Sequence, residues 1–144
     1  MRAAGTRRSG PASASASASA SAIEGYLAQA RADLDRVAPD ALATEVRDGA
    51  VVIDIRPSEQ RERDGSLPGA VVVDRNVLEW RLDPTSPHRL PLASGADIRY
   101  VLVCNEGYSS SLAAATLRRL GLGRATDLEG GYRAWAAMVA RQER

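Results

Sequence analysis

Cys104, the only cysteine of the chain, is the residue whose type and position best suit covalent chemistry. It follows the apolar run 100–103 and begins a segment of small and polar residues, 104–111, before a helix-like stretch at 112–120. A loop from a strand into a helix points backbone N–H groups at one spot, and the helix start adds the positive end of its dipole. Because such surroundings lower the pKa of a thiol and favour the reactive thiolate, the sequence predicts a nucleophilic cysteine.

The alternative interpretation of a lone cysteine is a small buried apolar residue. That interpretation does not account for the position of Cys104 on a loop, nor for Gly107 and the three serines at 109–111. Glycine and serine there suit the close approach of an anion to the backbone, so we favour the reactive interpretation. A single cysteine also rules out an internal disulfide and a multi-cysteine zinc site.

Several other functions of such a loop need a further residue that this sequence does not supply. A cysteine phosphatase requires an arginine to clamp the phosphate, and the usual position, six residues after the cysteine, is Ser110. A cysteine protease requires a histidine base, but the only histidine, His88, lies in a proline-rich loop. The segment 107–111 lacks the closing glycine of a serine-hydrolase elbow, and 121–123 lacks the third glycine of a dinucleotide motif. What remains is a thiolate activated by backbone dipoles, which suits attack on a sulfane sulfur to give a persulfide.

The elements that must position Cys104 alternate between strands and helices along the chain. This alternation predicts an α/β fold, a parallel sheet of about five strands with helices on both faces. Ligands of such sheets bind beyond the carboxyl ends of the strands, which is where Cys104 lies. We expect strands at 51–55, 70–73, 100–103 and 125–128, and helical segments at 23–39, 40–49, 58–64, 76–82, 112–120 and after Gly131.

The 144 residues are enough for one domain with a sizeable core. Residues 1–22 are rich in alanine and serine and contain little to bury, so they predict a disordered tail. An N-terminal helix at 23–39 and a domain at 40–144 follow.

The net charge of +1 gives no electrostatic footprint for nucleic acid, and no apolar run is long enough to span a membrane. Without a secretory signal pattern, the expected location is cytoplasmic.

Four motifs occur in order along the predicted domain. They are the strand 51–56 ending in Asp-Ile-Arg, the turn 65–70 (Gly-Ser-Leu-Pro-Gly-Ala), residues 104–110, which we call the cysteine loop, and the segment 128–135 (Leu-Glu-Gly-Gly-Tyr-Arg-Ala-Trp). Together, over about residues 40–140, they resemble the single-domain rhodanese-like sulfurtransferases. The resemblance implies a rhodanese-like fold and a sulfurtransferase in which Cys104 carries the sulfur as a persulfide.

The resemblance also implies roles for the residues around Cys104. Asp54 and Arg56 would brace the strand ends and the loop behind the site, and no metal or other cofactor is expected. The partners would be a small-molecule or protein sulfur donor and a thiol acceptor. Sequence order alone places Arg75 and Trp80 near the mouth of the site. The backbone N–H groups of the loop would form a cradle for the persulfide, from Asn105, Glu106, Gly107, Tyr108, Ser109 and Ser110.

Two positions depart from the family pattern. Ser66 replaces the usual histidine of the turn, a change expected to be structural. Glu106 places an acid in the cradle, where a carboxylate disfavours a dianionic donor and raises the pKa of a neighbouring thiol. We therefore expect a persulfide donor in preference to thiosulfate. The competing hypothesis, to which Glu106 and the added N-terminal helix point, is a catalytically weak or inactive rhodanese-like module for interaction or regulation.

Overall fold

The sheet of this protein is parallel throughout. The computed structural model describes residues 20–144, so most of the predicted tail, residues 1–19, lies outside the described residues. Four strands lie in the order β2-β1-β3-β4, and an isolated parallel bridge between Val37 and Leu128 extends the edge beyond β4. The predicted parallel α/β sheet is thus confirmed, with four strands. Their bounds are β1 Val51–Asp54, β2 Val71–Val72, β3 Tyr100–Val103 and β4 Thr126–Asp127.

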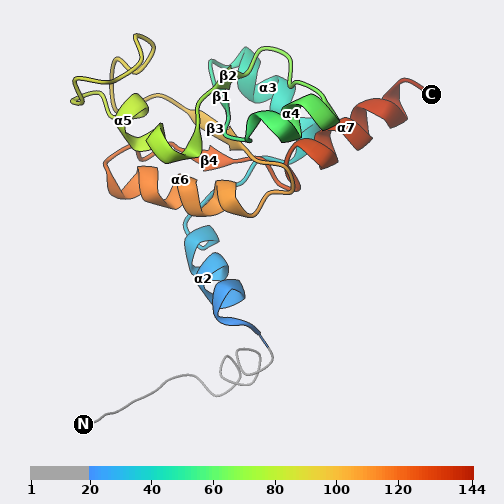
Figure 1. Ribbon diagram of the computed structural model, residues 1–144, viewed down its shortest axis with the longest axis horizontal. Helices are drawn as coiled ribbons and strands as arrows, with labels where there is room; N and C mark the ends of the chain where they lie inside the picture. Colours follow the sequence, from blue (N-terminus) through green and yellow to red (C-terminus); the bar gives the residue numbers. More distant parts are fainter. Residues whose placement is uncertain (1–19) are drawn as a thin grey trace.

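Helices cover both faces of the sheet (Figure 1). Helices α5 (Leu78–Leu82) and α6 (Ser109–Arg119) pack on one face, and α3 (Leu42–Arg47) and α7 (Gly131–Gln142) on the other. The remaining helical elements of residues 20–144 are α2 (Ala22–Arg31), α4 (Ser58–Asp64) and two short 3-10 turns, η1 (Pro39–Ala41) and η2 (Arg75–Val77).

The central strand β3 contributes to both hydrophobic cores. Side chains alternate between the two faces of a strand, so Tyr100 and Leu102 pack in the core beneath α5 and α6. Val101 and Val103 pack in the opposite core, with Leu42 of α3 and Tyr132 of α7 among their neighbours. All four residues of β3 are fully buried. The end of β3, where Cys104 follows, is therefore held from both sides.

The N-terminal helix is shorter than the predicted 23–39. Helix α2 begins with a capping box between Ser21 and Glu24 and ends at Arg31. The chain then becomes extended, and Val37 N–H donates to the carbonyl of Asp127 while Glu129 N–H donates to the carbonyl of Val37. The apolar spacing that continues the helical pattern through Val37 serves instead to pack this segment against the sheet edge. Tertiary pairing overrides the local periodicity here.

Two other helix starts differ from the sequence prediction. Asp40 does not cap a helix; the 3-10 turn η1 carries the chain into α3, which begins at Leu42. Helix α6 begins at Ser109 instead of Leu112, so the three serines form its first turn. Serine has only moderate helix propensity, and the contacts of these hydroxyls, described below, hold the turn in place.

Candidate active site

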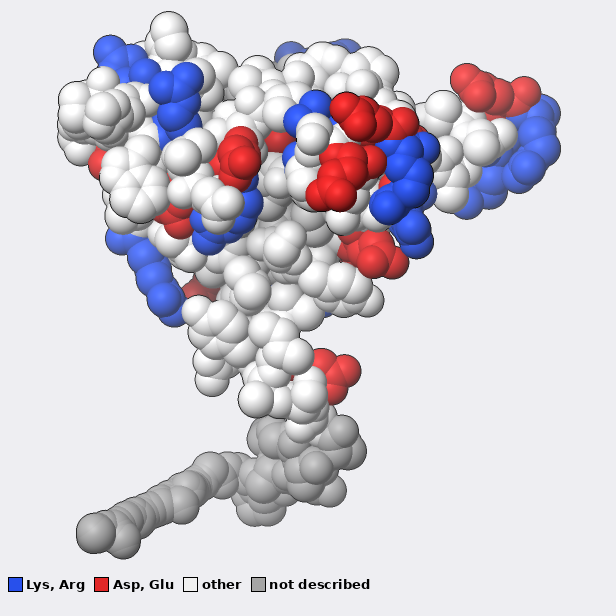
Figure 2. All heavy atoms as spheres, in the orientation of Figure 1, with Lys and Arg blue, Asp and Glu red and all other residues white. Residues whose placement is uncertain are grey.

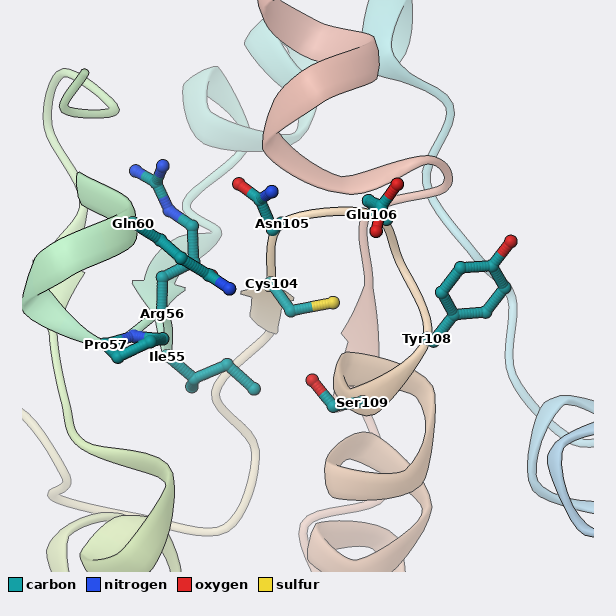
Figure 3. Close-up of a pocket in the computed structure, with 9 residues that line it drawn as sticks. All are labelled: Ile55, Arg56, Pro57, Gln60, Cys104, Asn105, Glu106, Tyr108 and Ser109. Carbon is teal, nitrogen blue, oxygen red and sulfur yellow. The ribbon is translucent and has the colours of Figure 1, made fainter. Parts of the chain in front are cut away.

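Cys104 lies directly beyond the carboxyl end of β3, at the base of a small pocket (Figure 3). The cysteine is 6% exposed, and the pocket has a volume of about 240 Å³. One wall is formed by residues 55–57, which follow β1, together with Gln60 of α4. The other wall is the cysteine loop itself, through residues 104–106, 108 and 109. The site therefore sits at the sheet edge where the sequence predicts it.

The cysteine loop curls around the Cys104 sulfur (Figure 3). The N–H groups of Gly107 and Ser110 donate to Sγ at 3.1 and 3.4 Å. The Ser110 hydroxyl lies 3.2 Å from the same sulfur. The structure thus brings two of the predicted cradle N–H groups to the sulfur, together with a serine hydroxyl that the sequence analysis did not single out.

Burial and hydrogen bonding oppose each other at the thiol. Burial raises the pKa of Cys104, while hydrogen bonding with the hydroxyl and N–H of Ser110, with the Ser109 hydroxyl and with Gly107 N–H lowers it. The hydrogen bonds prevail, and the pKa of Cys104 lies below its ordinary value of 9.0. No histidine or other side-chain base takes part among the groups that shift it.

Glu106 does not have the effect that its position in the loop suggests. Its side chain is 57% exposed and pairs with Arg133 of α7 at 3.5 Å. It is not one of the main causes of the shift in the pKa of Cys104, which is lowered overall. The expected increase in the thiol pKa is therefore wrong, because the carboxylate faces an arginine at the surface and not the sulfur.

Asn105 and Tyr108 also direct their side chains away from the sulfur (Figure 3). With its amide oriented to satisfy both neighbours, Asn105 accepts from Arg133 Nε at 3.2 Å and donates to Asp64 Oδ2 at 3.3 Å. The Tyr108 ring is 60% exposed, and the guanidinium of Arg31 lies over it, 5.7 Å from the ring centroid. Asn105 thus ties the loop to α4 and α7, whereas Tyr108 contributes to the surface.

Three glycines allow the loop and the start of α7 to touch. A Cβ on Gly131 would lie 2.5 Å from the Cys104 carbonyl oxygen and 2.7 Å from Gly107 N. A Cβ on Gly107 would lie 2.8 Å from Gly130 N, and all three glycines have positive φ. The close approach lets Tyr132 N–H donate to the Cys104 carbonyl at 2.9 Å. The Gly-Gly motif therefore anchors the cysteine loop from behind.

A buried carboxylate that the sequence analysis missed lies behind the serines. Asp127, at the end of β4, is fully buried and accepts hydrogen bonds from the Ser110 and Ser111 hydroxyls at 2.7 and 2.8 Å. Arg36 pairs with it through two nitrogens, at 2.8 and 3.2 Å. Cys104, Ser110, Asp127 and Arg36 therefore form one continuous chain of polar contacts.

Two arginines hold the loop from its outer side. Arg31 and Arg36 both donate to the carbonyl of Gly107, at 2.7 and 3.0 Å. Arg31 also donates to the Ser111 hydroxyl at 3.0 Å. Both arginines precede the motifs that carry the family resemblance, and no motif marks them. Asp127, an acidic residue inside the predicted strand 125–128, was the one sequence feature that could have indicated a buried charge in need of such a partner.

Asp54 and Arg56 form a buried ion pair beside the pocket, both 1% exposed. Their closest contact is 2.8 Å, and Arg56 also donates to the carbonyl of Gly65 at 2.9 Å. The guanidinium lies 4.0 Å from the centroid of the Tyr132 ring and points away from the sulfur (Figure 3). The pair thus connects strand β1, helix α7 and the turn that follows α4. It braces these elements and does not contact Sγ.

Three other residues lie away from the pocket. Neither Arg75 nor Trp80 lines it: Arg75 pairs with Glu79 at 2.9 Å, and Trp80 is 56% exposed near α6. Sequence order therefore misplaced both at the mouth. His88 does not line the pocket either.

Comparison with known proteins identifies the class to which this fold and site belong. Residues 38–138 match the Rhodanese-like domain family, and the chain belongs to that family. A comparison with curated proteins finds no match. None of the helices within residues 20–144 has the length and apolar character needed to cross a bilayer.

Solved structures share the fold. RPA3614 from Rhodopseudomonas palustris, described as a protein of unknown function and possible tyrosine phosphatase, is 32% identical with a TM-score of 0.74, covering 83% of this chain and 92% of that one. A thiosulfate sulfurtransferase from Pseudomonas aeruginosa is 28% identical with a TM-score of 0.58, covering 74% of this chain and 18% of that one. The human single-domain sulfurtransferase TSTD1 is 24% identical with a TM-score of 0.58, covering 71% and 95% respectively.

Proposed function

We propose that this protein is a sulfurtransferase that carries sulfane sulfur as a persulfide on Cys104. The observation that carries the proposal is the surroundings of Sγ, which receives the N–H groups of Gly107 and Ser110 at 3.1 and 3.4 Å. These donors stabilise an anion on sulfur and lower the pKa of the thiol without a side-chain base. Sulfur transfer needs such an anion at both stages of the reaction.

The reaction runs in two displacements. The Cys104 thiolate attacks the sulfane sulfur of the donor, the bond holding that sulfur breaks, and the donor leaves with the electron pair. The charge then resides on the outer sulfur of the Cys104 persulfide. An acceptor thiolate attacks that outer sulfur and takes it, and the original thiolate is restored. Because the chain has no second cysteine, the acceptor must come from outside.

A phosphatase has less support, although one similar structure is described as a possible tyrosine phosphatase. The residue six positions after the cysteine is Ser110, which is fully buried and uses its hydroxyl on Asp127. Arg31 and Arg36 bind the Gly107 carbonyl on its outer side. Arg133 contacts the side chains of Asn105 and Glu106, and Arg56 pairs with Asp54 and points away from the sulfur. A dianionic phosphate on Sγ would thus lack the forked donor that such chemistry requires.

An inert interaction module also has less support. A purely structural thiol does not require a pocket, two N–H donors and a lowered pKa. As to the donor, we propose an organic or protein persulfide in preference to thiosulfate. Glu106 lines the pocket, and its exposed carboxylate, although paired with Arg133 at 3.5 Å, adds negative charge near the mouth that disfavours a dianion.

The test is to weigh the protein after it reacts with a sulfane donor. Wild-type protein should gain one sulfur atom, and cyanide should remove it as thiocyanate. Cys104→Ser, which retains the size of the side chain, should gain none and should release no thiocyanate above background. Full turnover by the serine variant would refute the assignment, and absence of an adduct with every donor would favour the inert module.

A further inference from the structure

A second cavity adjoins the Cys104 pocket on the side of the N-terminal helix. It has a volume of about 430 Å³, within the range of small-molecule sites, and lies between α2 and α6. Its apolar lining comes from Ile23 and Leu27 of α2, Leu112 of α6 and the Tyr108 ring. Ile23 and Tyr108 are 58% and 60% exposed, so apolar surface is presented here to solvent. We call this cavity the α2–α6 groove.

The α2–α6 groove lies next to the pocket of the reactive sulfur, since the two cavities have lining residues in common. Tyr108 and Ser109 line both cavities, and hydrogen bonding from the Ser109 hydroxyl helps to set the pKa of Cys104. A molecule that places one end at Sγ therefore has an apolar surface along which the rest of it can lie.

The charge of the groove lining narrows the class of molecule that the groove can bind. Among the lining residues within 20–144, the one with a charged side chain is Glu24, whose carboxylate accepts from the N–H of Ser21. Figure 2 shows largely uncharged surface where α2 meets α6, in contrast to the intermixed charges over α4 and the C-terminal helix. An acidic residue and apolar walls disfavour a ligand body that carries negative charge. They suit a neutral hydrocarbon body.

We propose that the α2–α6 groove binds the apolar body of a small organic persulfide, R–S–SH, and delivers its outer sulfur to Cys104. The inference rests on the proposed function and adds the class of donor. The Cys104 thiolate attacks the outer sulfur, the S–S bond of the donor breaks, and R–S⁻ leaves to take up a proton. One S–S bond forms as another breaks, so no external oxidant or reductant is consumed.

Two donors that differ only in their apolar body test this proposal. Methanethiosulfonate and hexanethiosulfonate both carry a single negative charge and transfer the same sulfur, leaving a sulfinate. The five additional methylenes of the hexyl compound should raise kcat/KM by at least about tenfold if they are buried in the groove. Ile23→Ser should reduce this hexyl preference several-fold. Tyr26→Ser is the matched control, because Tyr26 is 51% exposed on the same helix but does not line the groove.

The outcomes separate the groove from the sulfur chemistry. Equal rates for the two donors, or a hexyl preference that survives Ile23→Ser, would overturn the groove while leaving Cys104 as a carrier. If neither donor loads sulfur, the proposed function fails, and the groove is judged by binding of unreactive hexanesulfonate. In that case, binding that is tighter than that of methanesulfonate and weakened by Ile23→Ser supports the groove. Equal binding overturns it.

Discussion

At Cys104, burial and hydrogen bonds act on the same thiol in opposite directions. The thiol is 6% exposed, so water and bulky reagents reach it only through the pocket. Its anion would be costly at that depth without the donors from Gly107 and Ser110. Each hydrogen bond at the sulfur therefore contributes to the population of thiolate, so removing the Ser110 hydroxyl should change the thiol pKa in a predictable direction.

Ser110→Ala should raise the pKa of Cys104. The contact between Sγ and the Ser110 hydroxyl, at 3.2 Å, lowers the thiol pKa because a hydroxyl at this distance can donate to the sulfur once the thiol proton has left, so its loss leaves burial less opposed. Alkylation by iodoacetamide requires the thiolate, and its rate rises with pH through the thiol pKa. The inflection should lie below 9.0 for the wild type and at higher pH for the variant. Ser94→Ala, an exposed serine, is the control, and an inflection displaced to lower pH in Ser110→Ala would contradict the assignment.

The residue-level chemistry was only partly predictable from the sequence. Cys104 and Gly107 are local features, since a cysteine after an apolar run and a glycine in a loop can be recognised in one short window. Asp127 and Arg36 are different, because their contact joins residues 91 positions apart. Neither local pattern nor composition indicates that pairing; only the fold brings β4 beside the segment that follows α2.

At the scale of elements, the cysteine loop is shaped by what packs behind it. Gly130 and Gly131 bring the start of α7 against the loop backbone, and Asp127 fixes the first turn of α6 through two serine hydroxyls. The loop thus depends on a glycine turn on one side and a buried charge on the other. Each support can be removed by a single substitution.

Gly131→Ala should destabilise the protein by more than about 2 kcal/mol and impair persulfide formation. A methyl group there would meet backbone atoms of Cys104, Asn105 and Gly107 within 2.7 Å, so the loop or α7 must move. Urea unfolding and sulfur loading measure the two effects. Gly121→Ala is the matched control: it shares a positive φ but has nothing within 4 Å, so only strain of about 1 kcal/mol is expected. Equal losses in both variants would contradict the packing role.

Asp127→Asn should cost about 3 kcal/mol of unfolding free energy, because it leaves Arg36 without its buried partner. Two serine hydroxyls lose a charged acceptor at the same time. The comparison is Asp35→Asn, whose carboxylate pairs with Arg99 and Arg118 but is 65% exposed, and which should cost less than about 1 kcal/mol. Both values follow from urea denaturation. Similar losses of unfolding free energy in the two variants would show that the buried Arg36–Asp127 pair stabilises the protein no more than an exposed pair does.

Element identities were largely predictable, whereas certain boundaries were not. The β-branched run that forms β1 and the apolar run that forms β3 indicate buried strands directly. The end of α2 was misplaced because Leu34 and Val37 continue its apolar spacing while packing on the sheet instead. The start of α6 was misplaced because its serines are stabilised by Asp127, a contact from a distant element.

Across the whole molecule, residues outside the matched family region contribute to the site. The family match covers 38–138, yet Arg31 and Arg36 hold the Gly107 carbonyl from a segment that precedes it. Helix α2 packs on α6 and has no buried residue of its own, so the core gains little from it. Its contribution is to the cysteine loop, which suggests a functional test.

Arg31→Met should slow sulfur loading several-fold while changing the unfolding free energy by less than about 1 kcal/mol. The variant loses the donors to Gly107 and Ser111 but retains an apolar side chain of similar length. Rapid-quench mass measurement of persulfide formation gives the rate, and urea denaturation gives the stability. Arg47→Met is the control, since Arg47 is exposed on α3 and bonds only within its own helix. An unchanged rate of sulfur loading in Arg31→Met would show that α2 does not contribute to the site.

The burial of Cys104 also determines which product its oxidation gives. A disulfide between two molecules requires both sulfurs to come within about 2 Å of each other, and so both must protrude. A sulfur that is 6% exposed at the base of a pocket cannot meet its counterpart on a second copy of the same shape. Small oxidants can still enter, so oxidation proceeds through sulfenic acid on isolated molecules and not through covalent dimers. The pocket that admits a small sulfur donor therefore also prevents the protein from cross-linking to itself.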